Sequence, residues 1–269
     1  MIFNIQEETI KVDAMEMDYI VFGNGTKPLV VLPGLGDGLK TVKGQSIPLA
    51  IFYKKYLKKF RIYAFSRRVK LPQNYTTREM ARDQKIVLNK LGLDKFYLMG
   101  GISQGGMIAQ HLAIEYPDGI EKLILAVTTS KPTKEVRNRI PKWIQFATLN
   151  DYKSLLIDAF ENMYTNKKLK LYRPFYSLIS KASKPKDFNR FIIQAKSCLS
   201  HDTTDELQEI KTPTLIVGAV EDKIVGYDIS IEMATRIKNS KFISFEKYGH
   251  AVYEECKDFN TKIIDFLLE

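Results

Sequence analysis

Apolar and polar positions follow two different periods along the chain. Short runs rich in β-branched, aromatic and leucine residues predict buried strands, and longer segments with apolar residues at helical spacing predict helices between them. Strands that alternate with helices are typical of a parallel sheet joined by crossover helices. We therefore predict an α/β fold, with a mostly parallel central sheet flanked by helices. The expected strands are 1–12, 17–22, 29–32, 61–65, 96–99, 123–127, 215–217 and 242–245, and the expected helices are 76–91, 104–115, 229–237 and 253–268.

The segment 131–200 breaks this alternation. It holds helical patterns but no convincing strand, and Pro132, Pro141, Pro174 and Pro185 interrupt it. It also holds 15 Lys and Arg against 5 Asp and Glu, so the whole +10 charge of the 269-residue chain falls within it. Such a shift in composition often marks an addition to a scaffold. We predict a core formed by 1–130 and 201–269 and a helical cap inserted at 131–200.

The charge of the cap bears on possible partners. Its lysines are scattered and no nucleic-acid-binding motif accompanies them, so we expect no nucleic acid partner. We expect the surplus charge to form a solvated face. The alternative is that it attracts an anionic substrate or an anionic membrane surface. No pattern indicates an oligomeric state.

The remaining composition indicates a cytoplasmic protein. Glu7, Glu8 and Lys11 stand near the start without a long apolar run, which does not resemble a secretory signal. No stretch approaches the roughly 18 apolar residues of a membrane-spanning helix. Cys198 and Cys256 are far apart and lack metal-like spacing, so we expect reduced thiols, with no metal and no cofactor.

A candidate nucleophile lies where a strand is expected to meet a helix. The strand 96–99 runs into Gly100-Gly101-Ile102-Ser103-Gln104-Gly105-Gly106, and a helix is expected to follow. A G-x-S-x-G pattern in this context indicates a sharp turn that exposes the serine oxygen, with Gly101 and Gly105 leaving room for the turn. The alternative is a glycine-rich crossover turn without chemistry. We predict that Ser103 is the nucleophile.

Serine needs a base, and the chain has three histidines. His250 follows the last expected strand, at the sheet edge where Ser103 is also expected, so we predict it to be the general base. His111 lies eight residues into the helix that Ser103 opens, too far along its axis to reach the serine. His201 ends the cap beside Asp202. We expect His201 to be a solvated hinge residue, with substrate contact as the alternative.

The base needs an acid and the reaction needs hydrogen-bond donors. Asp222 follows the strand 215–217 and gives the order Ser, Asp, His that this arrangement uses, and Glu221 is the runner-up. The backbone N–H of Gln104, directly after the nucleophile, is one expected donor to a developing oxyanion. The other is the N–H of Leu35, in a glycine-rich loop that turns at Gly34. No Gly-Lys-Ser/Thr follows this loop, which excludes a phosphate-binding P-loop.

Four segments together resemble the α/β-hydrolase superfamily, in its capped, single-domain, esterase-like branch. They are Pro33-Gly34-Leu35-Gly36, the elbow around Ser103, the strand from Pro213 to Gly218 followed by Asp222, and Gly249-His250. Two departures stand out. Pro33-Gly34 replaces the His-Gly common in relatives, and Ser66-Arg67-Arg68-Val69-Lys70-Leu71 replaces the usual Asp-x-Arg-Gly-x-Gly turn, which makes a loop near the expected site basic.

The resemblance implies an enzyme that acts on a small molecule. We predict hydrolysis of a carboxylic ester or thioester with a small or medium apolar acyl group, through an acyl-Ser103 intermediate. Relatives with the same skeleton also cleave lactones and carbon–carbon bonds. A ligand-binding or signalling protein of this fold, with little turnover, is the rival class. No cofactor is implied.

Overall fold

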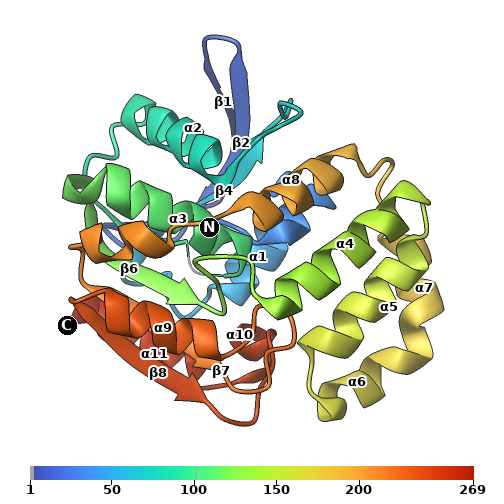
Figure 1. Cartoon of the computed structure of the whole chain (residues 1–269). Coiled ribbons are helices and arrows are strands. Elements are labelled where there is room, and N and C mark those ends of the chain that lie inside the picture. The colour runs from blue at the N-terminus through green and yellow to red at the C-terminus, as the bar shows by residue number, and fades with distance from the viewer. Residues whose placement is uncertain (1–2, 101) are drawn as a thin grey trace.

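The computed structural model describes residues 3–100 and 102–269. Within these residues, eight strands form one sheet in the order β1-β2-β4-β3-β5-β6-β7-β8. β1 and β2 are antiparallel, as are β2 and β4, and the other neighbours are parallel. The predicted mostly parallel sheet flanked by helices is confirmed (Figure 1). The strands are β1 Gln6–Val12, β2 Met15–Phe22, β3 Lys27–Val31, β4 Phe60–Arg68, β5 Phe96–Met99, β6 Ile120–Ala126, β7 Thr214–Ala219 and β8 Ser240–Phe245.

Helices cover both faces of the sheet because strand side chains alternate between faces. In β3, Leu29 and Val31 belong to the apolar cluster under α1 and α11, whereas Val30 belongs to the cluster under α2, α3 and α9. A capping box joins Thr76 and Glu79 at the start of α2. The helices of these two layers are α1 Ser46–Phe52, α2 Thr77–Lys90, α3 Gln104–Glu115, α9 Asp228–Arg236, α10 Val252–Glu255 and α11 Phe259–Leu268.

Two helical predictions differ from the structure. The single helix expected at 253–268 is two, because Cys256 takes an extended conformation that ends α10 before α11 begins. Helix α1 was not expected, and Pro48 stands among its residues. Proline is tolerated there because it lies in the first turn, where the backbone N–H has no partner within the helix.

Five α-helices stand between β6 and β7, in the segment predicted to be a cap. They have an apolar cluster of their own, which includes Trp143 and Phe191 and extends to Leu35 in the loop after β3. Figure 1 shows α4 to α7 grouped at one side of the sheet, with α8 leading the chain back to it. We call these the cap helices: α4 Lys134–Thr148, α5 Tyr152–Met163, α6 Asn166–Tyr172, α7 Tyr176–Ala182 and α8 Asn189–Ser200.

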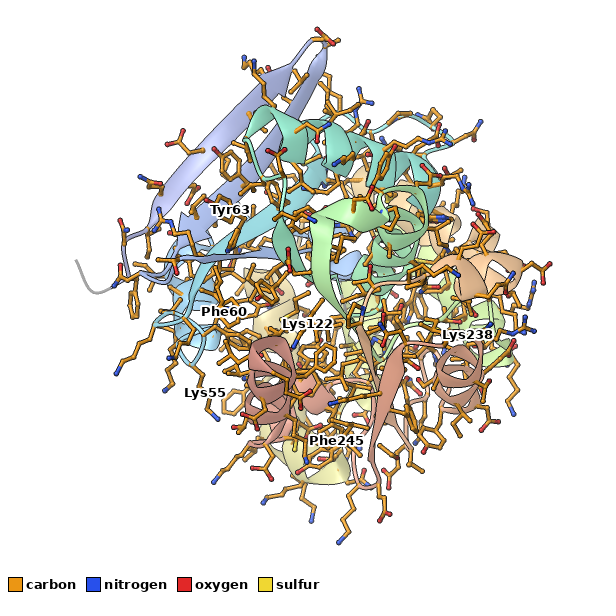
Figure 2. The ribbon with its side chains drawn as sticks, turned by 90° about the vertical axis from the view of Figure 1, so that its left-hand side faces the viewer. Lys55, Phe60, Tyr63, Lys122, Lys238 and Phe245 are labelled. Atoms are coloured by element: carbon orange, nitrogen blue, oxygen red, sulfur yellow. The ribbon has the colours of Figure 1, made fainter. Side chains whose placement is uncertain are left out.

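The side chains separate inside from outside in the expected way. Figure 2 shows Phe60 within the molecule, where it is fully buried, whereas Lys55 points outward. Among the helices of the described residues, none combines the length and the apolar character needed to cross a bilayer.

Candidate active site

Ser103 sits in a strained turn between β5 and α3. Its φ of 56° and ψ of −123° lie in a region that residues with a side chain rarely adopt, and such strain is typical of a nucleophile elbow. The hydroxyl of Thr128, just beyond β6, donates to the Ser103 carbonyl oxygen at 2.7 Å. A Cβ at Gly105 would lie 2.2 Å from the Leu32 carbonyl oxygen, so the close packing at this turn requires glycine. Gly101 lies outside the described residues.

The loop after β3 lies directly against this elbow. A Cβ on Gly34 would come within 3.4 Å of the Ser103 Cβ, so the loop and the nucleophile are in close contact. Leu35 begins the short 3₁₀ helix η1 (Leu35–Gly38) and is buried. Gln104 is the first residue of α3, where backbone N–H groups lack intrahelical acceptors. The structure thus places both predicted donor residues beside Ser103.

His250 and Asp222 are joined by a hydrogen bond. The His250 Nδ1 donates to the Asp222 Oδ2 at 2.8 Å, and both side chains are buried. The other oxygen of Asp222 accepts backbone N–H groups from Ile224 and Val225 at 2.8 and 3.1 Å, which fixes the carboxylate. With Nδ1 engaged, Nε2 is the ring nitrogen left to accept a proton. Glu221, the runner-up acid, is exposed.

The other two histidines form a separate buried pair. Thr77 Oγ1 lies 3.2 Å from the His111 Nε2 and 2.9 Å from the His201 Nδ1, and the two rings meet edge to face at 5.2 Å. Desolvation by burial lowers the pKa of His111 to about 4 and that of His201 to about 3. The expectation of a solvated hinge histidine at 201 was therefore wrong. His201 is enclosed where α2, α3 and the end of α8 meet.

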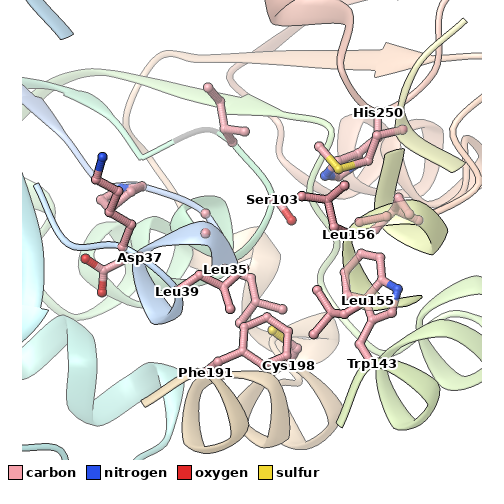
Figure 3. A pocket seen from close by; sticks show the side chains of 18 of the residues that line it. Leu35, Asp37, Leu39, Ser103, Trp143, Leu155, Leu156, Phe191, Cys198 and His250 are labelled. Carbon is pink, nitrogen blue, oxygen red and sulfur yellow. The ribbon is translucent and has the colours of Figure 1, made fainter. Parts of the chain in front are cut away.

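A cavity of about 550 Å³ opens beside Ser103 and His250 (Figure 3). Its walls are mainly apolar and come from the loop after β3, α1 and the cap helices α4, α5 and α8. Among the described residues that line it, Lys40 alone has a permanent positive charge, and it is exposed. Asp37 also lines the cavity, but its carboxylate is paired with Arg190 at 2.7 Å. The cavity can therefore hold an apolar group beside a serine, a histidine and backbone donors.

Sequence reasoning missed a buried polar network behind the loop of Leu35. Asp37 Oδ2 accepts hydrogen bonds from Arg190 Nη2 at 2.7 Å and Gln194 Nε2 at 2.9 Å, both on α8. Arg67, at the end of β4, donates to the Pro33 carbonyl oxygen at 2.6 Å. The basic turn that departs from the usual pattern was the available signal for Arg67. No local pattern indicated the two α8 residues.

The fold agrees with the comparisons. A family model described as alpha/beta hydrolase fold matches residues 27–256, and the chain belongs to this family. It is 28% identical over 196 residues to a 2-hydroxy-6-oxo-6-phenylhexa-2,4-dienoate hydrolase of Comamonas testosteroni, covering 70% of this chain and 68% of that protein.

Solved structures show the same fold over nearly the whole chain. An alpha/beta hydrolase enzyme from a Medee basin deep-sea metagenome library superposes with a TM-score of 0.86 at 21% identity, covering 97% of this chain and 98% of the other. The enol-lactonase from Burkholderia xenovorans LB400 gives a TM-score of 0.80 at 19% identity, covering 97% and 100%. The chain is thus similar to hydrolases of more than one kind.

Proposed function

We propose that this hydrolase cleaves a carboxylic ester or thioester with a small or medium apolar acyl group, using Ser103, His250 and Asp222 as its catalytic residues. The observation that carries the proposal is the strained Ser103 in the lining of an apolar cavity that the Asp222-bound His250 also lines. A strained serine, a base and an orienting acid are the parts that acyl transfer requires.

The proposed reaction has two halves, acylation of Ser103 and hydrolysis of the acyl-enzyme. His250 Nε2 takes the proton of the Ser103 hydroxyl as its oxygen attacks the carbonyl carbon, and Asp222 stabilises the imidazolium that forms. The N–H groups of Leu35 and Gln104 stabilise the negative oxygen of the tetrahedral intermediate. His250 then gives its proton to the leaving oxygen or sulfur, which departs and leaves acyl-Ser103. Water, activated by His250, hydrolyses this ester and restores the serine.

The cavity supports an apolar acyl group. The cap side presents Trp143, Leu155, Leu156 and Phe191, all buried, so an acyl chain or aromatic acid would be enclosed there. Burial of apolar surface stabilises binding by roughly 25 cal/mol per Å². The exposed Lys40 marks a more polar edge of the cavity.

Carbon–carbon bond hydrolysis is the second candidate, and the Comamonas testosteroni relative favours it by its name. A dienoate carries a carboxylate, which needs a cation or several donors once it leaves water. Among the described residues that line the cavity, the permanent cation is Lys40, and its side chain is exposed. A buried dienoate carboxylate would therefore lack the bidentate arginine partner suited to such a group. A lactone is a cyclic ester, so the enol-lactonase likeness is compatible with ester chemistry.

A substrate panel tests this choice. It comprises p-nitrophenyl esters from acetate to decanoate, matched acyl-CoA thioesters, lactones and a 2-hydroxy-6-oxo-dienoate, with product counted per enzyme molecule. We expect many turnovers on esters of small or medium acyl groups. Turnover of the dienoate alone would replace the proposal with carbon–carbon hydrolysis. Binding without repeated turnover of any compound would favour the ligand-binding class.

A further inference from the structure

The two N–H groups proposed for the oxyanion hole come from different segments of the chain. Leu35 belongs to the loop after β3, whereas Gln104 begins α3 after β5. An oxyanion hole works only if both donors are held at hydrogen-bond distance from one developing charge. The relative position of the two segments therefore matters for the rate.

One side chain of the core bridges the two segments. Arg67, at the end of β4, is buried, with 4% of its surface exposed. Its Nη2 donates to the Pro33 carbonyl oxygen at 2.6 Å, two residues before Leu35, and lies 3.4 Å from the Gln104 Oε1. Its backbone N–H also donates to Asp37 Oδ2 at 3.2 Å. A single planar guanidinium thus contacts the loop and the elbow together.

A second bridge comes from the cap helix α8. The side chain of the fully buried Gln194 donates from Nε2 to Asp37 Oδ2 at 2.9 Å, and its backbone carbonyl accepts from the Gln104 Nε2 at 2.7 Å. Arg190, one turn earlier, holds the same Asp37 oxygen at 2.7 Å. Helix α8 also lies close against η1, because a Cβ on Gly38 would be 2.7 Å from the Phe191 Cα.

These contacts reach both donor segments from behind, away from the reacting atoms. Arg67 is not among the residues that line the cavity, and neither is Gln194. Burying a guanidinium and an amide costs free energy unless their hydrogen bonds are made. Their placement at the junction of loop, elbow and cap helix therefore calls for a role other than substrate contact.

We propose that Arg67 and Gln194 are positioning residues that hold the N–H groups of Leu35 and Gln104 at the spacing an oxyanion requires. This inference rests on the proposed acyl-transfer function. Helix α8 then has two tasks: it lines the cavity and it holds the two donor segments of the oxyanion hole in place. Packing of α8 against the core and assembly of the oxyanion hole therefore occur together.

The test uses three variants. Gln194→Met removes the side-chain donor to Asp37 and leaves the backbone contact to Gln104. Arg67→Met removes the Nη2 donor at similar volume, and Arg67→Lys keeps a positive charge without the planar guanidinium. Each is assayed on the best ester found for the wild type. We expect kcat to fall about 10- to 100-fold in the Met variants with KM changed less than threefold, because loss of a whole donor costs about 10²- to 10³-fold. Arg67→Lys should fall less than Arg67→Met.

A transition-state analogue separates positioning from general damage. Trifluoromethyl ketones form a tetrahedral oxyanion on an active serine, so their Ki should rise in proportion to the loss in kcat/KM. The matched control is Thr203→Val, which removes a buried hydrogen bond of 2.6 Å to Gln110, next to the end of α8 but away from the loop of Leu35. It should lower Tm without changing kcat or Ki.

Three outcomes decide the matter. A folded Gln194→Met enzyme with wild-type kcat and ketone Ki overturns the proposal, whether or not Arg67→Met folds. A loss of kcat that tracks Tm and equals the loss in Thr203→Val also overturns it. Absence of ester turnover in the wild type is a failure of the proposed function instead, and is seen before any variant is made.

Discussion

Lowering the pH from about 7.5 to about 5 should destabilise the folded chain by about 4 kcal/mol, because His111 and His201 stay neutral when folded. Burial lowers the pKa of His111 to about 4 and that of His201 to about 3. Nearby Arg78 disfavours the charged form of His111, and His111 does the same for His201. In the unfolded chain both return to the ordinary histidine value of about 6.5.

The direction and size follow from proton linkage. Between pH 6.5 and 4 the unfolded chain binds more protons than the folded chain, so stability is complete above pH 6.5 and falls as the pH drops. At pH 5 each unfolded histidine gains about 2 kcal/mol from protonation, while the folded pair gains almost nothing. This result holds for any folded pKa well below 5. Two histidines give about 4 kcal/mol, a large part of the typical 5–15 kcal/mol of a domain.

Urea unfolding at a series of pH values measures this effect, with the double variant His111→Gln/His201→Gln as the reference. The variant removes both titrating groups, so its stability should vary about 4 kcal/mol less over the same range, and each single variant about 2 kcal/mol less. Burial raises the pKa of Asp83, which acts in the opposite direction but is common to all four proteins. Equal pH dependence in the wild type and the double variant would refute the reasoning.

Three further predictions concern the site. Asp222→Asn should lower kcat by about 10³- to 10⁴-fold because it favours the wrong tautomer of His250; damage by Glu221→Gln in an ester assay would reassign the acid. Gly105→Ala should cost at least about 1–3 kcal/mol in urea unfolding, since its Cβ would lie 2.2 Å from a backbone oxygen; an unchanged midpoint would contradict this. Added salt should raise the KM for an anionic ester more than the KM for a neutral ester of equal size. Lys40→Gln should make the two salt responses equal. If neutralising the α6 residues Lys167, Lys168 and Lys170 made the two salt responses equal instead, the basic cap would be the attracting surface.

The sheet and its helices could be predicted because strands and helices leave strong periodic signals over many residues. β3 and α2 are examples, since 29–32 is a buried run and 76–91 has buried residues at helical spacing. Helix α1 could not be predicted, because a seven-residue segment with Pro48 gives too weak a pattern. The interruption at Cys256 was also hidden, since the apolar spacing continues across it.

Some residues of the candidate site could likewise be predicted from the sequence, and others could not. Ser103, Asp222 and His250 stand at strand ends in local patterns, so the sequence indicated them. Arg67 and Gln194 are far apart in sequence and meet only through tertiary packing, which no local pattern encodes. The buried state of His201 was likewise hidden, because it depends on Thr77 and His111 from other helices.

The central claim is that Ser103 carries the acyl group. Mass spectrometry of the quenched enzyme, first intact and then digested, tests this claim most directly. The enzyme is mixed with an excess of p-nitrophenyl ester, quenched within the first turnover and digested to locate the added mass. We predict one acyl group on Ser103, repeated release of p-nitrophenolate afterwards, and loss of both in Ser103→Ala. An acyl group on another residue, or steady turnover by Ser103→Ala, would contradict the account.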